Sequence, residues 1–267
     1  MARFCAGLAL AMCLLSAAPA WAGNFQVIPV KLEMGPDTKT GVLRVINQSD
    51  QALTIQVTSK VWTQPDGSTE DRYEDTRDIV LFPPLFTLKP GQEQVLRIGY
   101  RGPAGREQER AYRVFLEELP VEAPGATVLR LALRIGVPVF VQPPEATAQF
   151  KAQPLPVTQS IAGVAVTNAG NRHIIVGDIT AVGRDRMGQE ILNRKRAGWY
   201  VLARSMRPFG VLLDEQVCRQ VAELTLSVVI GRELHDVSIP PPPDATHCIP
   251  PKDAKPVPPP VLQRPTG

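Results

Sequence analysis

Short runs in which apolar and polar residues alternate make up most of the chain from Asn24 onward, and residues that favour turns separate them. Clear runs lie at residues 42–46, 53–57, 79–82 and 94–99, and turn residues lie at 47–50, 65–67, 83–84 and 90–91. A period of two places every second side chain on one face, as in a half-buried β-strand. Because few windows are long enough for a helix, the pattern predicts an all-β fold of β-sandwiches.

Residues 106–119 fit two structures. Their propensities would suit an amphipathic helix, yet Tyr112, Val114 and Leu116 also fall on one face of a strand. A lone helix would interrupt a continuous run of strands, so we predict a strand.

The N-terminus has the features of a secretory signal peptide at residues 1–22. Arg3 precedes an apolar run at 6–15, and Ala20 and Ala22 form a small-residue cleavage site. The apolar run is too short to span a membrane, and no later stretch reaches the roughly 18 to 20 apolar residues that spanning requires. We therefore expect an exported protein without membrane insertion.

Cleavage would remove Cys5 and Cys13 and leave Cys218 and Cys248. Two cysteines in an exported chain predict one disulfide, worth roughly 3 to 4 kcal/mol in the chain-entropy model. Two buried free thiols are the alternative.

Tandem prolines at Pro143 and Pro144 mark a hinge between two sets of strands. The second set lies at residues 161–166, 173–179, 198–202, 210–213 and 223–230. We predict an immunoglobulin-like domain at 23–142 and a smaller β-sandwich domain at 143–239. Residues 240–267 contain 11 prolines, a composition that favours extended polyproline conformations, and we expect disorder beyond Cys248.

Neither charge nor motifs indicate nucleic-acid binding or catalysis. The net charge is +3, with basic and acidic residues interleaved, so no basic face is expected. The histidines, His173, His235 and His247, lack metal-ligand spacing, and no nucleophile or phosphate-loop motif is present. We expect no catalytic residues, no metal and no cofactor; a hydrolase is the remotest alternative.

The most unusual segment is a long candidate strand at residues 127–139, about 40 Å at ~3.3 Å per residue. One face carries six aliphatic residues: Leu129, Leu131, Leu133, Ile135, Val137 and Val139. The other face carries Gly136 and Pro138, which weaken strand pairing and favour a sheet edge. A central strand that faces the core is one interpretation; the other is an edge that pairs with another protein's sheet.

Several motifs carry a resemblance to a known family. They are Val-Lys-Leu-Glu-Met at 30–34, Val-Ile-Asn at 45–47, Trp62, Phe-Pro-Pro-Leu-Phe at 82–86, Leu-Arg-Ile at 96–98, Ala-Tyr-Arg-Val-Phe-Leu-Glu-Glu-Leu-Pro at 111–120 and the strand at 131–143. Together they resemble the PapD-like periplasmic chaperones of the chaperone–usher pilus pathway, over most of residues 24–239. The resemblance implies a boomerang of two immunoglobulin-like domains.

The resemblance also implies a function. Such chaperones bind pilus subunits that lack their last strand, complement them with the long edge strand (here residues 129–139) and deliver them to an outer-membrane usher without ATP. The sequences of residues 134–140 and 111–119 are similar to those of the archaic branch of the family, whose subunits resemble spore-coat U proteins.

The family anchors the subunit's terminal carboxylate with basic residues in the cleft between the domains. Lys31 falls at one of these positions, but Pro138 stands where the long strand usually has a lysine. Arg97 or Arg134 is therefore expected to replace it, since a guanidinium binds a carboxylate bidentately. The alternatives are an exposed surface Lys31 and a solvated Arg134. A structural or adhesive cell-surface protein remains the second functional class.

Overall fold

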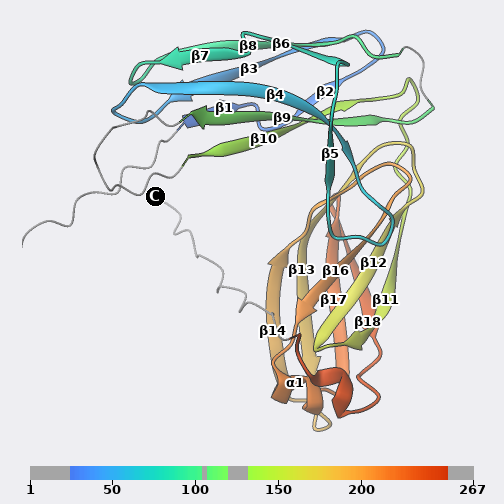
Figure 1. The fold of residues 1–267 in the computed structure, drawn as a ribbon. Helices are drawn as coiled ribbons and strands as arrows, with labels where there is room; N and C mark the ends of the chain where they lie inside the picture. Colours follow the sequence, from blue (N-terminus) through green and yellow to red (C-terminus); the bar gives the residue numbers. More distant parts are fainter. Residues whose placement is uncertain (1–24, 104–106, 120–131, 252–267) are drawn as a thin grey trace, which may run out of the picture.

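A computed structural model describes residues 25–103, 107–119 and 132–251. Two β-sandwiches meet at an angle and give the molecule an L shape (Figure 1). This confirms the predicted all-β, two-sandwich fold. The predicted signal peptide lies outside the described residues.

The N-terminal sandwich consists of two sheets. The first has the order β1-β3-β8-β6, with β1 (Phe25–Ile28), β3 (Thr40–Asn47), β8 (Glu93–Tyr100) and β6 (Ile79–Phe82). The second has the order β2-β10-β9-β4-β5, with β2 (Leu32–Met34), β10 (Arg134–Val141), β9 (Arg110–Leu119), β4 (Leu53–Thr63) and β5 (Arg72–Asp75), and β7 (Leu85–Leu88) also pairs with β4. Alternate aliphatic side chains such as Leu43, Ile55, Leu96 and Val114 are fully buried between the sheets.

The ambiguous segment at residues 106–119 forms strand β9, as predicted. β9 is central in its sheet, because it pairs antiparallel with β4 on one side and with β10 on the other. Pairing on both edges satisfies its backbone groups and overrides the helix propensity of its sequence.

The C-terminal sandwich also has two sheets among the described residues. β11 (Phe150–Thr158), β12 (Ile161–Asn168) and β16 (Met206–Leu212) form the smaller one. The larger has the order β14-β13-β17-β18, with β14 (Glu190–Ala197), β13 (Ile174–Arg184), β17 (Glu223–Ile230) and β18 (Glu233–Ile239), and β15 (Tyr200–Val201) also pairs with β13.

Two elements at the far end of this domain carry the cysteines. Helix α1 (Glu215–Gln220) holds Cys218, and the 3₁₀ turn η1 (Ala245–Cys248) holds Cys248. The two residues form a disulfide with a Cα–Cα distance of 5.6 Å, as predicted. The segment after residue 239 is therefore fastened to the domain as far as Cys248.

Strand β16 ends the smaller sheet, and arginines from β14 cover its edge. Arg194 Nη1 donates to the carbonyl of Leu212 at 2.5 Å, and Arg196 Nη1 donates to the carbonyl of Gly210. Side-chain donors thus occupy acceptors that an intruding strand would otherwise use.

β10 is shorter than the predicted strand. It begins at Arg134, so the described residues Ala132 and Leu133 precede it, and Leu129 and Leu131 lie outside the described residues. The parallel partner β2 covers only residues 139–141 of β10. Among the described strands none pairs with that side of residues 134–138, which agrees with the predicted sheet edge.

No helix in the described part of the chain is long and apolar enough to cross a membrane.

Candidate functional site

The core-facing side of β10 carries the aliphatic residues that were expected to enter a partner. Val137 and Val139 are fully buried in the core of their own domain, whereas Leu133 and Ile135 are only partly buried against it. Val137 and Val139 thus pack in the core of their own domain, and their place in the donor strand stays a prediction. Leu133 and Ile135 lie where the strand edge opens and retain surface for a partner.

Strand register places three cationic side chains in one row across the sheet. Leu32 lies beside Val139, so Lys31 comes next to Pro138, and Pro138 is in turn paired with Arg113 of β9. Arg113 is also paired with Lys60 of β4. We call Lys31, Arg113 and Lys60 the cation row. Pro138, which replaces the expected lysine, lies between the first two.

Arg113 is buried, with 7% of its surface exposed, and it lies among aromatic rings. Its guanidinium carbon is 4.6 Å from the ring centre of Trp62 and 5.2 Å from that of Trp199. Such cation–π contacts hold the group in place. Yet Nη1 is buried without a hydrogen-bond partner among the described residues, so Arg113 has an unused donor.

Gly136 gives Arg113 the space that this position requires. A Cβ at residue 136 would lie 3.1 Å from Arg113 Nε and 3.0 Å from Phe115 Cε1. Any larger residue would push the guanidinium or the ring aside. The glycine read from the sequence as a strand-weakening residue thus makes room for the buried arginine.

Lys31 is about one third exposed and already has a partner. Its Nζ lies 2.5 Å from Glu33 Oε1, and the hydrogen bond from Lys31 holds the pKa of Glu33 below its ordinary value. The charges of Arg172 and His173 in the C-terminal domain act in the same direction. Arg172 Nε is a second buried donor without a partner among the described residues. Lys31 thus lies at the junction of the two domains.

The other two expected anchors lie elsewhere. Arg134 is half-exposed on β10, 3.5 Å from Glu117 Oε2 and 4.1 Å above the Phe115 ring, two side-chain rows from Pro138. Arg97 lies on β8 in the opposite sheet, paired with Val42 and Phe82. The structure thus brings Lys31 together with Arg113 and places Arg97 on another face. The cation beside Pro138 is Arg113, and the choice of anchor among these cations stays a prediction.

Buried polar pairs connect the two domains at their junction. Glu109 and His173 are both almost completely buried, and both Glu109 carboxylate oxygens lie 2.9 Å from His173 Nδ1. The His173 ring stacks on Phe140 with ring centres 3.6 Å apart. Each domain therefore supplies the partner of a polar group buried by the other.

Asp71 forms a second link between the domains. It accepts hydrogen bonds from Gln64 Nε2, Trp199 Nε1 and Arg207 Nη1 at 2.8–2.9 Å. Burial raises the pKa of Asp71, but hydrogen bonds, including those from Gln64 and Trp199, and the charge of Arg207 outweigh burial and lower it. Trp199 also contacts Arg113, so this link supports the cation row.

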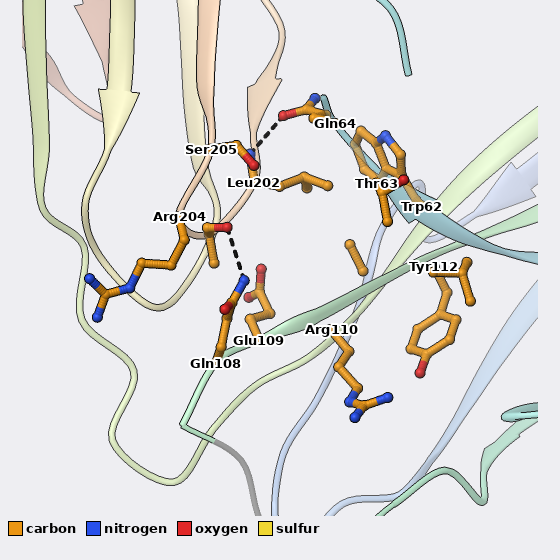
Figure 2. Close-up of a pocket in the computed structure, with 13 residues that line it drawn as sticks. Trp62, Thr63, Gln64, Gln108, Glu109, Arg110, Tyr112, Leu202, Arg204 and Ser205 are labelled. Atoms are coloured by element: carbon orange, nitrogen blue, oxygen red, sulfur yellow. Dashed lines mark hydrogen bonds between the residues drawn. The ribbon is translucent and has the colours of Figure 1, made fainter. Parts of the chain in front are cut away.

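A pocket with a volume of about 350 Å³ lies at the junction, and Figure 2 shows residues that line it. Gln64 accepts from the Leu202 backbone N–H at 2.9 Å, and Gln108 Nε2 donates to the Ala203 carbonyl at 3.0 Å. The two glutamines reach from the N-terminal domain to one turn of the C-terminal domain. The pocket wall is thus part of the structure that fixes the interdomain angle.

Sequence reasoning missed Arg113 and Arg172. Arg113 alternates with the core residues Tyr112 and Val114, so the sequence places it on the polar face of β9. That face is covered by Trp62 and by Trp199 of the second domain. The available signal was strand pairing, because Arg113 faces Pro138 in the register that β9 and β10 adopt.

Comparison with known proteins agrees with this architecture. Residues 24–147 match the model of the PapD N-terminal domain of pili and flagellar-assembly chaperones. The resemblance to pilus assembly chaperones is thereby confirmed. No curated protein matches the chain as a sequence.

Three solved structures illustrate the shared fold. The CsuC–CsuE chaperone–tip adhesion subunit pre-assembly complex from the archaic chaperone–usher Csu pili of Acinetobacter baumannii matches with a TM-score of 0.55 at 16% identity, over 82% of this chain and 99% of the matched chain. The Escherichia coli chaperone DraB matches with a TM-score of 0.51 at 17% identity, over 82% of this chain and 100% of the matched chain. The Salmonella enterica SafA pilin–SafB chaperone complex matches with a TM-score of 0.51 at 16% identity, over 82% of this chain and 96% of the matched chain.

Proposed function

We propose that the protein is a periplasmic, non-enzymatic chaperone that binds pilus subunits with an incomplete sandwich through the open edge of β10. The observation that carries this proposal is the combination of that edge with Arg113 on the neighbouring strand, whose Nη1 has no partner among the described residues. An open edge binds an extended strand through main-chain hydrogen bonds, and a buried cation next to it fixes where that strand ends.

The subunit strand pairs with residues 134–138 on the side that β2 leaves open. Leu133 and Ile135 then contribute their partly exposed side chains to the subunit's groove. Burying an aliphatic side chain contributes about 1.5 to 3 kcal/mol before ordering costs. The two side chains thus supply part of the affinity, and the main chain supplies the rest.

The terminal carboxylate of the subunit binds Arg113, with Lys31 as a second cation on the other side of Pro138. Lys31 is secondary because Glu33 already neutralises it. Arg113 is the primary anchor because its charge is buried and its Nη1 lacks a hydrogen-bond partner among the described residues. A carboxylate bound there satisfies this donor without breaking an existing hydrogen bond.

Delivery to an outer-membrane usher needs a surface that stays accessible while a subunit is bound. The outer face of the β1-β3-β8-β6 sheet carries exposed Val42, Val80 and Phe82 around Arg97. This face lies on the sheet opposite β10. We assign the usher contact to it and the subunit contact to β10, with folding of the bound subunit rather than ATP as the driving force. The branch that fits the sequence is the archaic one.

Co-expression with the cognate subunit tests the proposal. Ile135→Glu places a charge at the open edge, and Val95→Glu places the same charge at an exposed position of the other sheet. We expect the subunit to co-purify with wild type and Val95→Glu and to be lost with Ile135→Glu. Equal recovery with both variants would exclude the β10 edge as the binding site.

A further inference from the structure

A groove of about 420 Å³ lies on the outer face of the β11-β12-β16 sheet in the C-terminal domain. Val164 and Phe209 point from this sheet into the core. The side chains that alternate with them point outward in three paired rows. These rows are Ala165 with Pro208, Gly163 with Gly210, and Ile161 with Leu212.

Two glycines form the floor of this groove. Gly163 and Gly210 are direct cross-strand partners, and Leu155 of β11 is the partner of Gly163 on its other side. A Cβ at residue 163 would lie 3.2 Å from Leu155 Cδ1, and one at residue 210 would lie 2.5 Å from Ile161 Cγ2. The aliphatic walls thus lean over a strip without side chains, and they remain only half-buried.

The chain itself leads into the groove. Cys248 is held by the disulfide to Cys218, and its carbonyl accepts a hydrogen bond from Ser160 Oγ at 2.5 Å. Three residues later Pro251 is one of the residues that line the groove. The 16 residues that follow, 252–267, include Pro-Val-Pro-Pro-Pro-Val-Leu at 256–262.

We propose that this proline-rich segment of the same chain docks in the groove in an extended polyproline conformation. From Leu212 to Pro208 the groove extends over four strand residues, about 13 Å, which is the length of about four polyproline residues. The segment at 256–262 is long enough to fill it.

The chemistry of the groove suits a segment rich in proline. Proline has no N–H, so burial against an aliphatic surface leaves no donor unsatisfied. Its carbonyl needs a donor, and Arg196 lies at the groove with one nitrogen bonded to the Gly210 carbonyl and further N–H groups on the guanidinium.

Covalent attachment favours docking within one chain. Residues 252–255 join Pro251 to the segment, and a short tether of this kind gives an effective concentration in the millimolar range. A contact that separate molecules would make only at millimolar concentration is then populated within one chain. The proposal does not depend on subunit capture.

Methyl NMR of two chains tests it, the full mature chain and a chain that ends at Pro251. The truncation retains the disulfide and every residue of the groove. We expect the methyl resonances of Leu155, Ile161 and Leu212 to differ between the two chains, while those of Val42 and Val80 in the other domain coincide. A synthetic peptide of residues 252–267 added to the short chain should move the groove resonances toward their positions in the full chain.

Two results would overturn the proposal. Identical groove resonances in the two chains would show that the segment does not dock there. Groove shifts in the full chain that disappear on dilution would show that a second copy supplies the segment. Replacing residues 258–260 by serine in the full chain should reproduce the spectrum of the truncated chain, and an unchanged spectrum would likewise contradict docking through these prolines.

Discussion

Replacing Arg113 by methionine is the most direct test of the proposed subunit site. Methionine keeps an unbranched apolar side chain between Trp62 and Trp199 but removes the charge and the Nη1 donor, which has no partner in the described part of the chain. A hydrogen bond to a charged group contributes about 1.5 to 3 kcal/mol. Since about 1.4 kcal/mol is a factor of ten, the affinity for a subunit should fall roughly 10- to 150-fold.

The fold should tolerate this change. Loss of the cation–π contacts costs about 0.5 to 2 kcal/mol, and removal of a buried unpaired donor offsets part of that cost. Thermal unfolding should therefore show a small decrease in stability. Lys60→Ala is the matched control, because Lys60 is the neighbour of Arg113 in the cation row and is paired with Asp75. We expect it to bind the subunit as wild type does.

The assay is the dissociation rate of the chaperone from its immobilised cognate subunit. A second subunit with three glycines added at its C-terminus moves the carboxylate away from the cleft. If Arg113 reads the carboxylate, the effects of Arg113→Met and of the extension should not add, as a double-mutant cycle would show. Additive effects would refute carboxylate recognition by Arg113, and an unchanged dissociation rate of Arg113→Met would refute any role in binding.

Three further outcomes are expected. Asp71→Asn should lower the free energy of unfolding by about 1 to 3 kcal/mol at neutral pH. Because the folded-state pKa of Asp71 is lowered, this stabilisation is complete above the unfolded pKa of about 4 and is lost as the pH falls through the folded pKa. Urea titrations of wild type and variant should therefore give free energies of unfolding that converge in acid. A difference between them that does not change with pH would contradict the role of the Asp71 carboxylate. Combined Arg194→Ala and Arg196→Ala should expose the β16 edge and produce concentration-dependent oligomers in sedimentation, whereas a monomeric variant would show that the edge needs no cover. Replacing Cys218 and Cys248 by serine should reduce stability by roughly 3 to 4 kcal/mol in denaturant unfolding, and a much smaller loss would contradict the chain-entropy model for this 30-residue separation.

Much of the fold could be predicted from local patterns. The alternation of apolar and polar residues predicted strand β9, and the hinge prolines marked the end of β10. Both signals are local, because the two-residue period of a strand and the missing N–H of proline depend only on neighbouring residues. β14 escaped notice because Arg194, Lys195 and Arg196 interrupt its alternation. Helix α1 has six residues, too few for a periodic signal.

The site could be predicted only in part, because it depends on contacts between distant segments. Lys31 and Pro138 were visible through the resemblance, but their neighbour across the strand was not. Arg113 reads as a solvent-facing residue of β9 until Trp199, from the other domain, covers it. A single sequence carries no pattern for burial that a second domain creates.

The buried junction has a consequence for how the molecule can be engineered. Glu109 and His173 find their partners only across the junction, and Asp71 depends on Trp199 and Arg207 in the same way. A chimera that joined this N-terminal domain to another sandwich would leave Glu109 buried without its histidine, at the cost of an unsatisfied charge. The two domains therefore form one exchangeable unit, and a transplant must carry both sides of the junction together.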